Sequence, residues 1–146
     1  MRKSHIFYSF LIITISCSLL HAGELPVSDD LYDDIMSEIV LPFLSALKDG
    51  DVDSIKRYIA GDMYESKKVL LEQNKEYPEF LRNYYRGVEF YVENTAENGD
   101  YIIVDITVEY PNGDSGSGKL YLCQINDITH GMQETEIWKI IDFSYK

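Results

Sequence analysis

The sequence predicts an α+β domain in which helices come first and an antiparallel sheet of about four strands follows. Two observations support this prediction. From Val88 onward, apolar and polar residues alternate with a period of two, which is typical of half-buried strands. Before that point the apolar residues recur every four positions, as on one side of a helix: Leu31, Ile35, Ile39, Phe43 and Leu47.

The first helix is predicted to begin after Ser28, which can cap it, and to end at Gly50. Pro42 interrupts its apolar stripe because proline cannot donate a backbone hydrogen bond inside a helix. The helix is therefore either kinked at this point or divided into two helices that meet at Leu41.

Three shorter helices are expected next. Asp51 caps the first of them, which ends at Gly61, and Asp62 opens the second. The third has Pro78 in its first turn, where proline is favoured, and it ends before Gly87. The expected buried anchors of the helix after Asp62 are Met63, Val69 and Leu70.

The strands are expected over residues 88–93, 101–110, 119–125 and 136–143. Asn98 and Gly99 form a dipeptide that is typical of a tight hairpin turn. Residues 111–118 are rich in turn-forming residues and predict a long, flexible hairpin tip. The side of the central strand that should face the helices carries Ile102, Val104, Ile106 and Val108.

The N-terminus predicts a signal peptide over residues 1–22, which leaves one domain over residues 23–146. Arg2 and Lys3 precede an apolar run, and the small residue Ala22 follows it. This order is typical of a secretory signal, and the run is short for a membrane span. The mature protein is therefore expected to be exported, either to the periplasm or into the medium.

Cys17 leaves a second route of export open. Residues 14–17 resemble a bacterial lipoprotein cleavage box, in which the cysteine would be lipidated and would tether the domain to the outer membrane. Because the apolar run continues beyond Cys17 to Leu20, cleavage after Ala22 is the favoured interpretation. Cys123 would then be the lone cysteine of the mature chain, and no internal disulfide is expected.

The net negative charge of the chain argues against anionic partners. The chain carries 25 acidic and 13 basic residues, for a net charge of −12. Such a domain repels nucleic-acid phosphates and anionic lipid, so contact with a membrane is expected only through a lipid anchor. The apolar fraction of 45% and the length of 146 residues are those of an ordinary single globular domain.

Two segments resemble a known superfamily. Residues 43–51, with the sequence FLSALKDGD, are similar to the helix-turn-helix opening of the nuclear-transport-factor-2-like proteins. Residues 138–143, WKIIDF, resemble the last strand of small exported bacterial members, among them lipoprotein-like proteins of unknown function. The resemblance covers roughly residues 31–143 and implies a cone-shaped fold with a pocket between the helices and a curved sheet.

Aromatic residues supply the candidate pocket. Twelve tyrosines, six phenylalanines and one tryptophan are many for a chain of this length. Some of them could line an apolar pocket with a few polar tips, which suits a small hydrophobic ligand, or they could simply fill the core. The candidate pocket residues are Tyr84, Tyr85, Phe90, Tyr110 and Trp138.

The outer side of the sheet is a candidate interface. It is too apolar to be given wholly to water, and contiguous patches of this kind usually meet a partner. A homodimer is the first expectation and another exported protein the second, unless the C-terminal residues 143–146 fold back over this face. The candidate interface residues are Tyr91, Tyr101, Ile103, Tyr121 and Ile125, with Cys123 beside them.

No residue is assigned to catalysis, to a metal or to a cofactor. The superfamily includes isomerases and dehydratases with an Asp/Tyr pocket, but Asp105 and Glu109 lie on the polar side of their strand, away from the expected pocket. His130 has no further ligand at a suitable spacing, and Asp49, Asp51 and Asp53 do not complete a calcium loop.

The sequence thus favours an exported, non-catalytic binding or interaction domain. Two alternatives stay open. One is an isomerase- or dehydratase-type enzyme. The other is an acidic inhibitor or immunity-type protein that masks a basic partner, which the charge of the chain permits.

Overall fold

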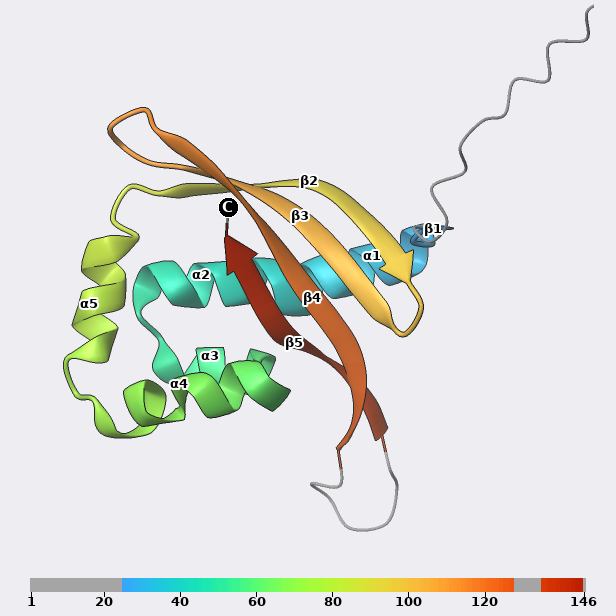
Figure 1. The fold of residues 1–146 in the computed structure, drawn as a ribbon, viewed down its shortest axis with the longest axis horizontal. Helices are drawn as coiled ribbons and strands as arrows, with labels where there is room; N and C mark the ends of the chain where they lie inside the picture. Colours follow the sequence, from blue (N-terminus) through green and yellow to red (C-terminus); the bar gives the residue numbers. More distant parts are fainter. Residues whose placement is uncertain (1–24, 128–134, 146) are drawn as a thin grey trace, which may run out of the picture.

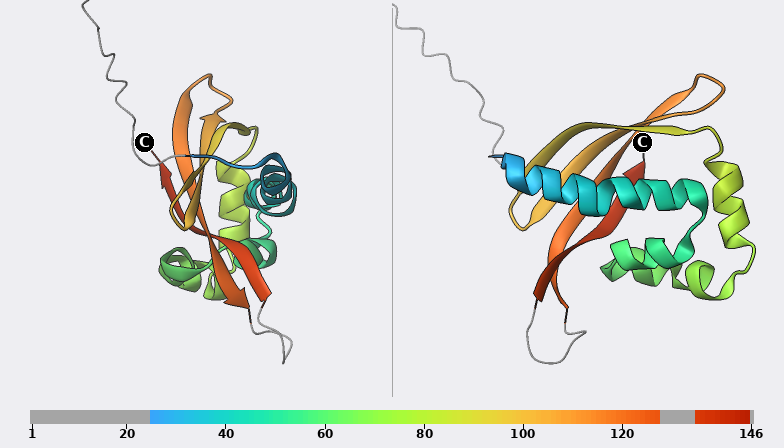
Figure 2. Two further views of the ribbon diagram at one scale, coloured as in Figure 1. Left: turned by 90° about the vertical axis from the view of Figure 1, so that its right-hand side faces the viewer. Right: turned by 180° about the vertical axis from the view of Figure 1, so that it is seen from behind.

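The computed structural model describes residues 25–127 and 135–145, and the chain folds as α+β, as predicted. One antiparallel sheet has the strand order β1-β2-β3-β4-β5. A long helical rod lies along one face of the sheet, and the shorter helices gather near one end of the rod (Figure 1, Figure 2). The strands are β1 (Leu25–Pro26), β2 (Glu89–Asn98), β3 (Tyr101–Glu109), β4 (Ser115–Asp127) and β5 (Thr135–Tyr145).

The rod is the predicted first helix, and at Leu41 its hydrogen bonding changes from π-helical to α-helical. Pro42 lies in the first turn of the second α-helical part, and the π-helical turn just before it accommodates a residue that cannot donate a backbone hydrogen bond. A single π-helical segment joins the two α-helical parts, so the rod continues without a break (Figure 2). Its segments are α1 (Asp29–Ile35), the π-helix η1 (Met36–Val40) and α2 (Leu41–Asp49).

Three shorter helices follow, namely α3 (Val52–Tyr58), α4 (Gly61–Gln73) and α5 (Tyr77–Tyr84). The link between α3 and α4 runs along the outer edge of β5, where the Ala60 N–H donates to the carbonyl oxygen of Ile140 at 2.9 Å. The Ile140 carbonyl at this sheet edge is therefore satisfied within the chain.

The predicted anchors of α4 are partly wrong. Met63 is buried as expected, but Val69 and Leu70 are exposed, and Leu71 is buried in their place. Met63 and Leu71 are eight positions apart and so share one side of the helix, whereas Val69 points away from that side. The position of the buried side depends on how α4 lies against β5, which the local pattern does not specify.

The sheet has five strands rather than four, because Leu25 and Pro26 pair with Glu97 and Ala96 of β2. The predicted hairpin loop is also shorter than expected, since β4 begins at Ser115. Gly118 lies in this strand, and its lack of a side chain leaves room for the ring of Phe143. A Cβ at this position would lie 3.0 Å from Cε2 of Phe143.

The last strand is longer than predicted and runs to Tyr145. Phe143 faces the helices, where its ring meets that of Phe43 edge-on at 6.4 Å. Through residue 145, then, the C-terminal segment continues the sheet and does not fold back over its outer face.

The predicted register of β3 is confirmed. Its four inward residues are completely or almost completely buried, and they pack with inward residues of β4 and β5 against the rod. The largest fully buried side chains are Ile35, Val40, Phe43, Val88, Ile102, Val104, Ile106, Val108, Leu120, Leu122 and Ile140.

Candidate functional site

Helix α5 carries a stripe of aromatic residues. Tyr77, Phe80 and Tyr84 recur at the three- and four-residue spacing that puts side chains on one side of a helix. The Tyr77 and Phe80 rings stack with centroids 6.0 Å apart, and those of Phe80 and Tyr84 stack at 5.8 Å. Phe80 is 55% exposed and Tyr84 is 51% exposed, while Leu81 on the same helix is buried in the core.

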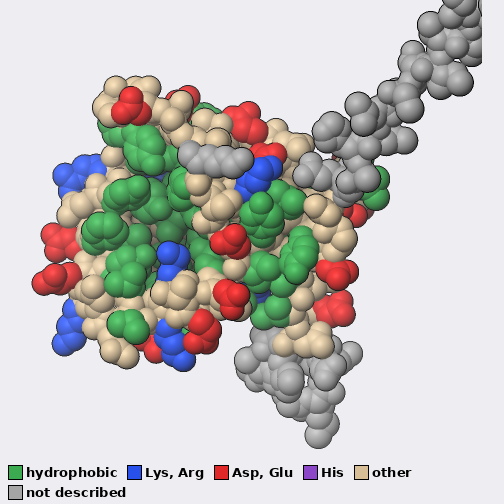
Figure 3. Space-filling view, in the orientation of Figure 1, with side chains coloured by type: hydrophobic (Ala, Val, Ile, Leu, Met, Phe, Trp, Pro, Cys, Tyr) green, Lys and Arg blue, Asp and Glu red, His purple; other side chains and the backbone are tan. Residues whose placement is uncertain are grey.

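Tyr85 connects this stripe to the interior. Its ring stands almost perpendicular to that of Tyr84, with centroids 4.9 Å apart, and lies 5.6 Å from the ring of Phe90 on β2. Tyr85 is only 8% exposed. The rings therefore form one continuous array from the surface of α5 into the core, and Figure 3 shows hydrophobic side chains gathered over α5, α4 and the neighbouring part of β5.

Two further tyrosines bring their hydroxyl groups to the same place. Tyr145, at the end of β5, lies close enough to Tyr85 for each to shift the pKa of the other, and Tyr84 likewise shifts the pKa of Tyr110, just after β3. A turn fixes Tyr110, because its N–H donates to the carbonyl oxygen of Asp114 at 2.9 Å. We call these six residues the aromatic cluster: Tyr77, Phe80, Tyr84, Tyr85, Tyr110 and Tyr145.

Four tyrosines of the cluster have raised pKa values. Burial raises the pKa of Tyr77, Tyr85 and Tyr145, and for Tyr145 the neighbouring Tyr85 adds to the rise. The pKa of Tyr110 is raised first by the neighbouring Tyr84 hydroxyl and then by burial. Apart from burial, every group that shifts these four pKa values is another tyrosine of the cluster.

The structure brings four of the five predicted pocket residues into one neighbourhood: Tyr84, Tyr85, Phe90 and Tyr110. Trp138 lies elsewhere. It pairs with Gln124 across β4 and β5 and lines a cleft with Leu31 of α1, near the other end of the rod. The prediction omitted Tyr77, Phe80 and Tyr145, although the spacing of the first two within α5 could have indicated them.

The predicted interface residues all lie on the outer side of the sheet, but they are unequally exposed. Tyr91 and Tyr101 are each 46% exposed, and Tyr121 and Ile125 are half-buried. Ile103 is buried already in the single chain, between Ala96 and Tyr121 on the flanking strands.

This outer face is also hollowed. One depression of about 320 Å³ holds the ion pair between Asp105 and Lys119, whose Oδ1 and Nζ atoms are 2.6 Å apart. A second, of about 610 Å³, is lined by Tyr101, Ile103 and Tyr121. We give the aromatic cluster precedence as a ligand site because its side chains converge from three elements, whereas Asp105 and Lys119, which line the first depression, are paired with each other.

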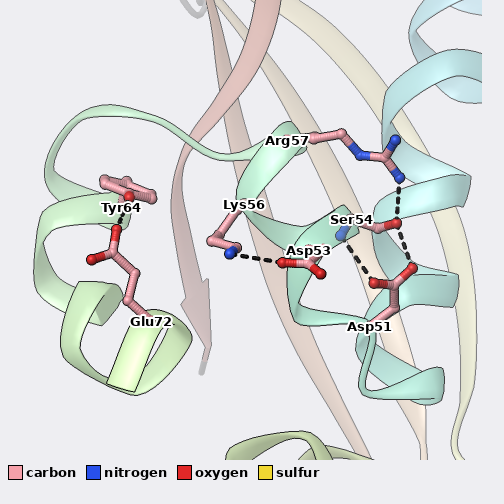
Figure 4. A network of polar contacts seen from close by, with 7 residues as sticks. All are labelled: Asp51, Asp53, Ser54, Lys56, Arg57, Tyr64 and Glu72. Atoms are coloured by element: carbon pink, nitrogen blue, oxygen red, sulfur yellow. Dashed lines mark hydrogen bonds and ion pairs between the residues drawn. The ribbon is translucent and has the colours of Figure 1, made fainter. Parts of the chain in front are cut away.

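A polar network at the start of α3 is structural (Figure 4). Asp51 caps the helix, since its Oδ1 accepts from the Ser54 N–H at 3.0 Å, and its Oδ2 accepts from the Ser54 hydroxyl. Arg57 donates to the same hydroxyl at 2.6 Å, and Asp53 pairs with Lys56. Every group is engaged in holding one short helix, as expected for capping residues.

The remaining predicted features are distributed as follows. Cys17 and His130 lie outside the described residues. Within residues 25–127 and 135–145, no three His, Cys, Asp or Glu side chains are grouped as they would be around a metal ion. In the same part of the chain, no helix combines the length and apolarity needed to cross a membrane.

Comparison with known proteins gives no further guide to this site, since no family model, curated protein or solved structure matches the chain.

Proposed function

We propose that this chain is an exported, non-catalytic binding domain that holds a small apolar ligand at the aromatic cluster. One observation carries the proposal: a continuous array of rings leads from the half-exposed Phe80 and Tyr84 to the buried Tyr85. Large rings left open to water beside a buried aromatic side chain suit an apolar ligand, for which the rings provide affinity and a few hydroxyls provide orientation.

The chemistry of the cluster favours binding over turnover. Proton abstraction needs a base whose pKa lies near the working pH, whereas the phenols of Tyr85, Tyr110 and Tyr145 have raised pKa values. Asp105, the carboxylate considered for an isomerase-type site, is paired with Lys119 on the opposite side of the sheet. We also propose the nuclear-transport-factor-2-like fold, supported by helices that precede and cover one antiparallel sheet.

The test is titration with a neutral apolar fluorophore such as Nile red. We expect saturable binding to the wild-type chain that Tyr84→Ser weakens at least several-fold. Tyr32→Ser is the matched control, because Tyr32 is an exposed tyrosine on α1 that takes no part in the cluster. Melting curves of both variants establish that they fold.

Equal binding by the two variants, or none by the wild type, would overturn the assignment of the site. Native mass spectrometry of the exported protein adds an independent measurement, because it reports a retained ligand and the processed mass together.

A further inference from the structure

We propose that a hollow between α2 and α5 binds a phosphate group through the side chains of Arg82 and Arg86. The hollow has a volume of about 540 Å³ and lies where the two helices end. The inference goes beyond the proposed function, because Phe80 and Tyr84 are not among the described residues that line this hollow. Its lining includes three basic residues, Lys48, Arg82 and Arg86, two acidic residues, Asp49 and Glu79, and the ring of Tyr85.

The two arginines of the hollow are bonded only to neutral groups. Arg82, in the last turn of α5, donates to the carbonyl oxygen of Asp49 at 3.4 Å. Arg86, in the turn after the helix, donates to Oδ1 of Asn83 at 2.5 Å. Within residues 25–127 and 135–145, neither guanidinium group forms an ion pair. Because a guanidinium group has five N–H donors, most of the donors at this hollow are left for a ligand.

The acidic residues of the hollow do not neutralise these arginines. Oδ2 of Asp49 accepts from the Ser45 hydroxyl at 3.3 Å, and Glu79 forms no ion pair in the part of the chain that the structure describes. Lys48 is partly balanced by Glu89, at 3.4 Å. Like charges gathered at one place repel each other, and a bound anion relieves that repulsion. Two arginines without a counter-ion, in a chain with 25 acidic residues, are the observation that carries the inference.

A phosphate group suits two guanidinium groups better than a carboxylate does. The planar fork of an arginine donates two parallel hydrogen bonds to a pair of oxygens. A phosphate monoester offers three oxygens and almost two negative charges, so both Arg82 and Arg86 can hold it at once. The net charge of −12 repels an extended polyanion. For a single group in contact with both arginines, however, the nearby attraction outweighs the repulsion of distant carboxylates, which water and salt screen.

The experiment is titration calorimetry on the folded chain at pH 8, where the phosphate group is a dianion, and at constant ionic strength. The probes are glycerol phosphate, inorganic phosphate and glycerate, in which a carboxylate replaces the phosphate group. We expect glycerate to bind at least roughly tenfold more weakly than glycerol phosphate. Tighter binding of glycerol phosphate than of inorganic phosphate assigns the site to an esterified phosphate, and equal binding assigns it to free phosphate.

Variants locate the binding at this hollow. Arg86→Gln should weaken glycerol phosphate binding roughly tenfold, and Arg86→Lys, which keeps the charge but not the fork, should recover only part of the loss. Glu79→Gln should strengthen binding several-fold, because it removes a carboxylate that repels the ligand. Lys75→Gln is the matched control, since it removes the same charge from an exposed lysine that lines a different hollow. Melting curves establish that all four variants fold.

Three results would each overturn the inference: no phosphate binding by the wild type, equal binding by Arg86→Gln and Lys75→Gln, or glycerate binding as tightly as glycerol phosphate. Titration with Nile red keeps this inference distinct from the proposed function. A wild type that binds Nile red but neither phosphate would remove this inference alone. A wild type that binds glycerol phosphate but not Nile red would remove the apolar site alone.

Discussion

The backbone of Gly50, at the end of α2, lies directly against the carbonyl oxygen of Pro78 in the first turn of α5. A Cβ added at Gly50 would be 2.2 Å from that oxygen, and Gly50 has a φ of +64°. Only glycine permits both the left-handed turn and this close approach. The contact fixes the start of α5 against the rod, and so it positions the helix that carries the aromatic stripe.

Gly50→Ala should therefore destabilise the fold far more than Gly99→Ala. Gly99 has almost the same φ, +62°, but nothing lies within 4 Å of the added Cβ. Backbone strain alone costs about 1–2 kcal/mol, and the clash with Pro78 should add roughly 1–3 kcal/mol at position 50. Urea unfolding of the two variants measures the difference, and equal losses would contradict the close contact.

The two sides of β3 should respond differently to a lysine. Val104 is fully buried, so Val104→Lys places an unpaired charge in the core and should prevent folding. Thr107 is on the outer side of the same strand and is half-buried, so Thr107→Lys should cost little. Thermal melts of both variants are the measurement, and similar melting temperatures would refute the register.

The sequence predicts best those features of the fold that depend on residues close together in the chain. The alternation at Ile102, Val104 and Ile106 is enough to define the buried side of β3, because successive side chains of a strand point to opposite faces of the sheet. Gly50 and Pro42 likewise mark helix boundaries through their own backbone chemistry.

The site is less predictable because it joins residues that are distant in the chain. Tyr145 meets Tyr85 only once β5 extends to the end of the chain, and the short apolar pattern of residues 136–143 gives no reason to extend it. Trp138 looks equivalent to the other aromatic residues in sequence, yet its strand position places it near α1. The rotation of α4 about its axis is determined by its packing against the sheet, and for this reason the predicted burial of Val69 is wrong.

Alkaline pH should destabilise the protein through the cluster. The folded pKa values of Tyr85 and Tyr145 are raised above the ordinary value near 10, so the stability that depends on their neutral forms is complete below about pH 10. It is lost as the pH rises further, because the unfolded chain then releases protons that the folded chain retains. Tyr145→Phe should make the decline shallower, as measured by urea unfolding at several pH values. Identical declines in the two proteins would contradict the raised pKa of Tyr145.

Removal of the proposed signal peptide predicts a defined mass for the mature protein. We expect the protein isolated from cells to begin near Gly23 or Glu24, because the signal segment is proposed to end at Ala22. Intact mass spectrometry decides this. A mass that still includes residues 1–20 would refute the signal peptide, and an acylated Cys17 would replace it with a lipid anchor.

The outer face of the sheet supplies the last prediction. We propose that it pairs with a second copy of the chain, because Tyr91 and Tyr101 are half-exposed on it, and Tyr101 lines a hollow together with Ile103 and Tyr121. Carboxylates border this face, with Glu89 and Glu109 directly opposite each other in the β2–β3 ladder. Two copies would bring like charges together, and salt would screen their repulsion.

A homodimer should therefore become stronger as salt is added, whereas a complex with a basic partner should become weaker. Sedimentation velocity at micromolar concentration and at low and high ionic strength measures this for the wild type. Tyr121→Glu should abolish the dimer, and Tyr101→Glu, at a more exposed position, covers the case in which the first variant does not fold. Tyr32→Glu on α1 should leave the dimer unchanged. A wild type that stays monomeric at every salt concentration would exclude pairing through this face. At high salt the repulsion between the carboxylates is screened, so it could not be the reason for the absence of a dimer.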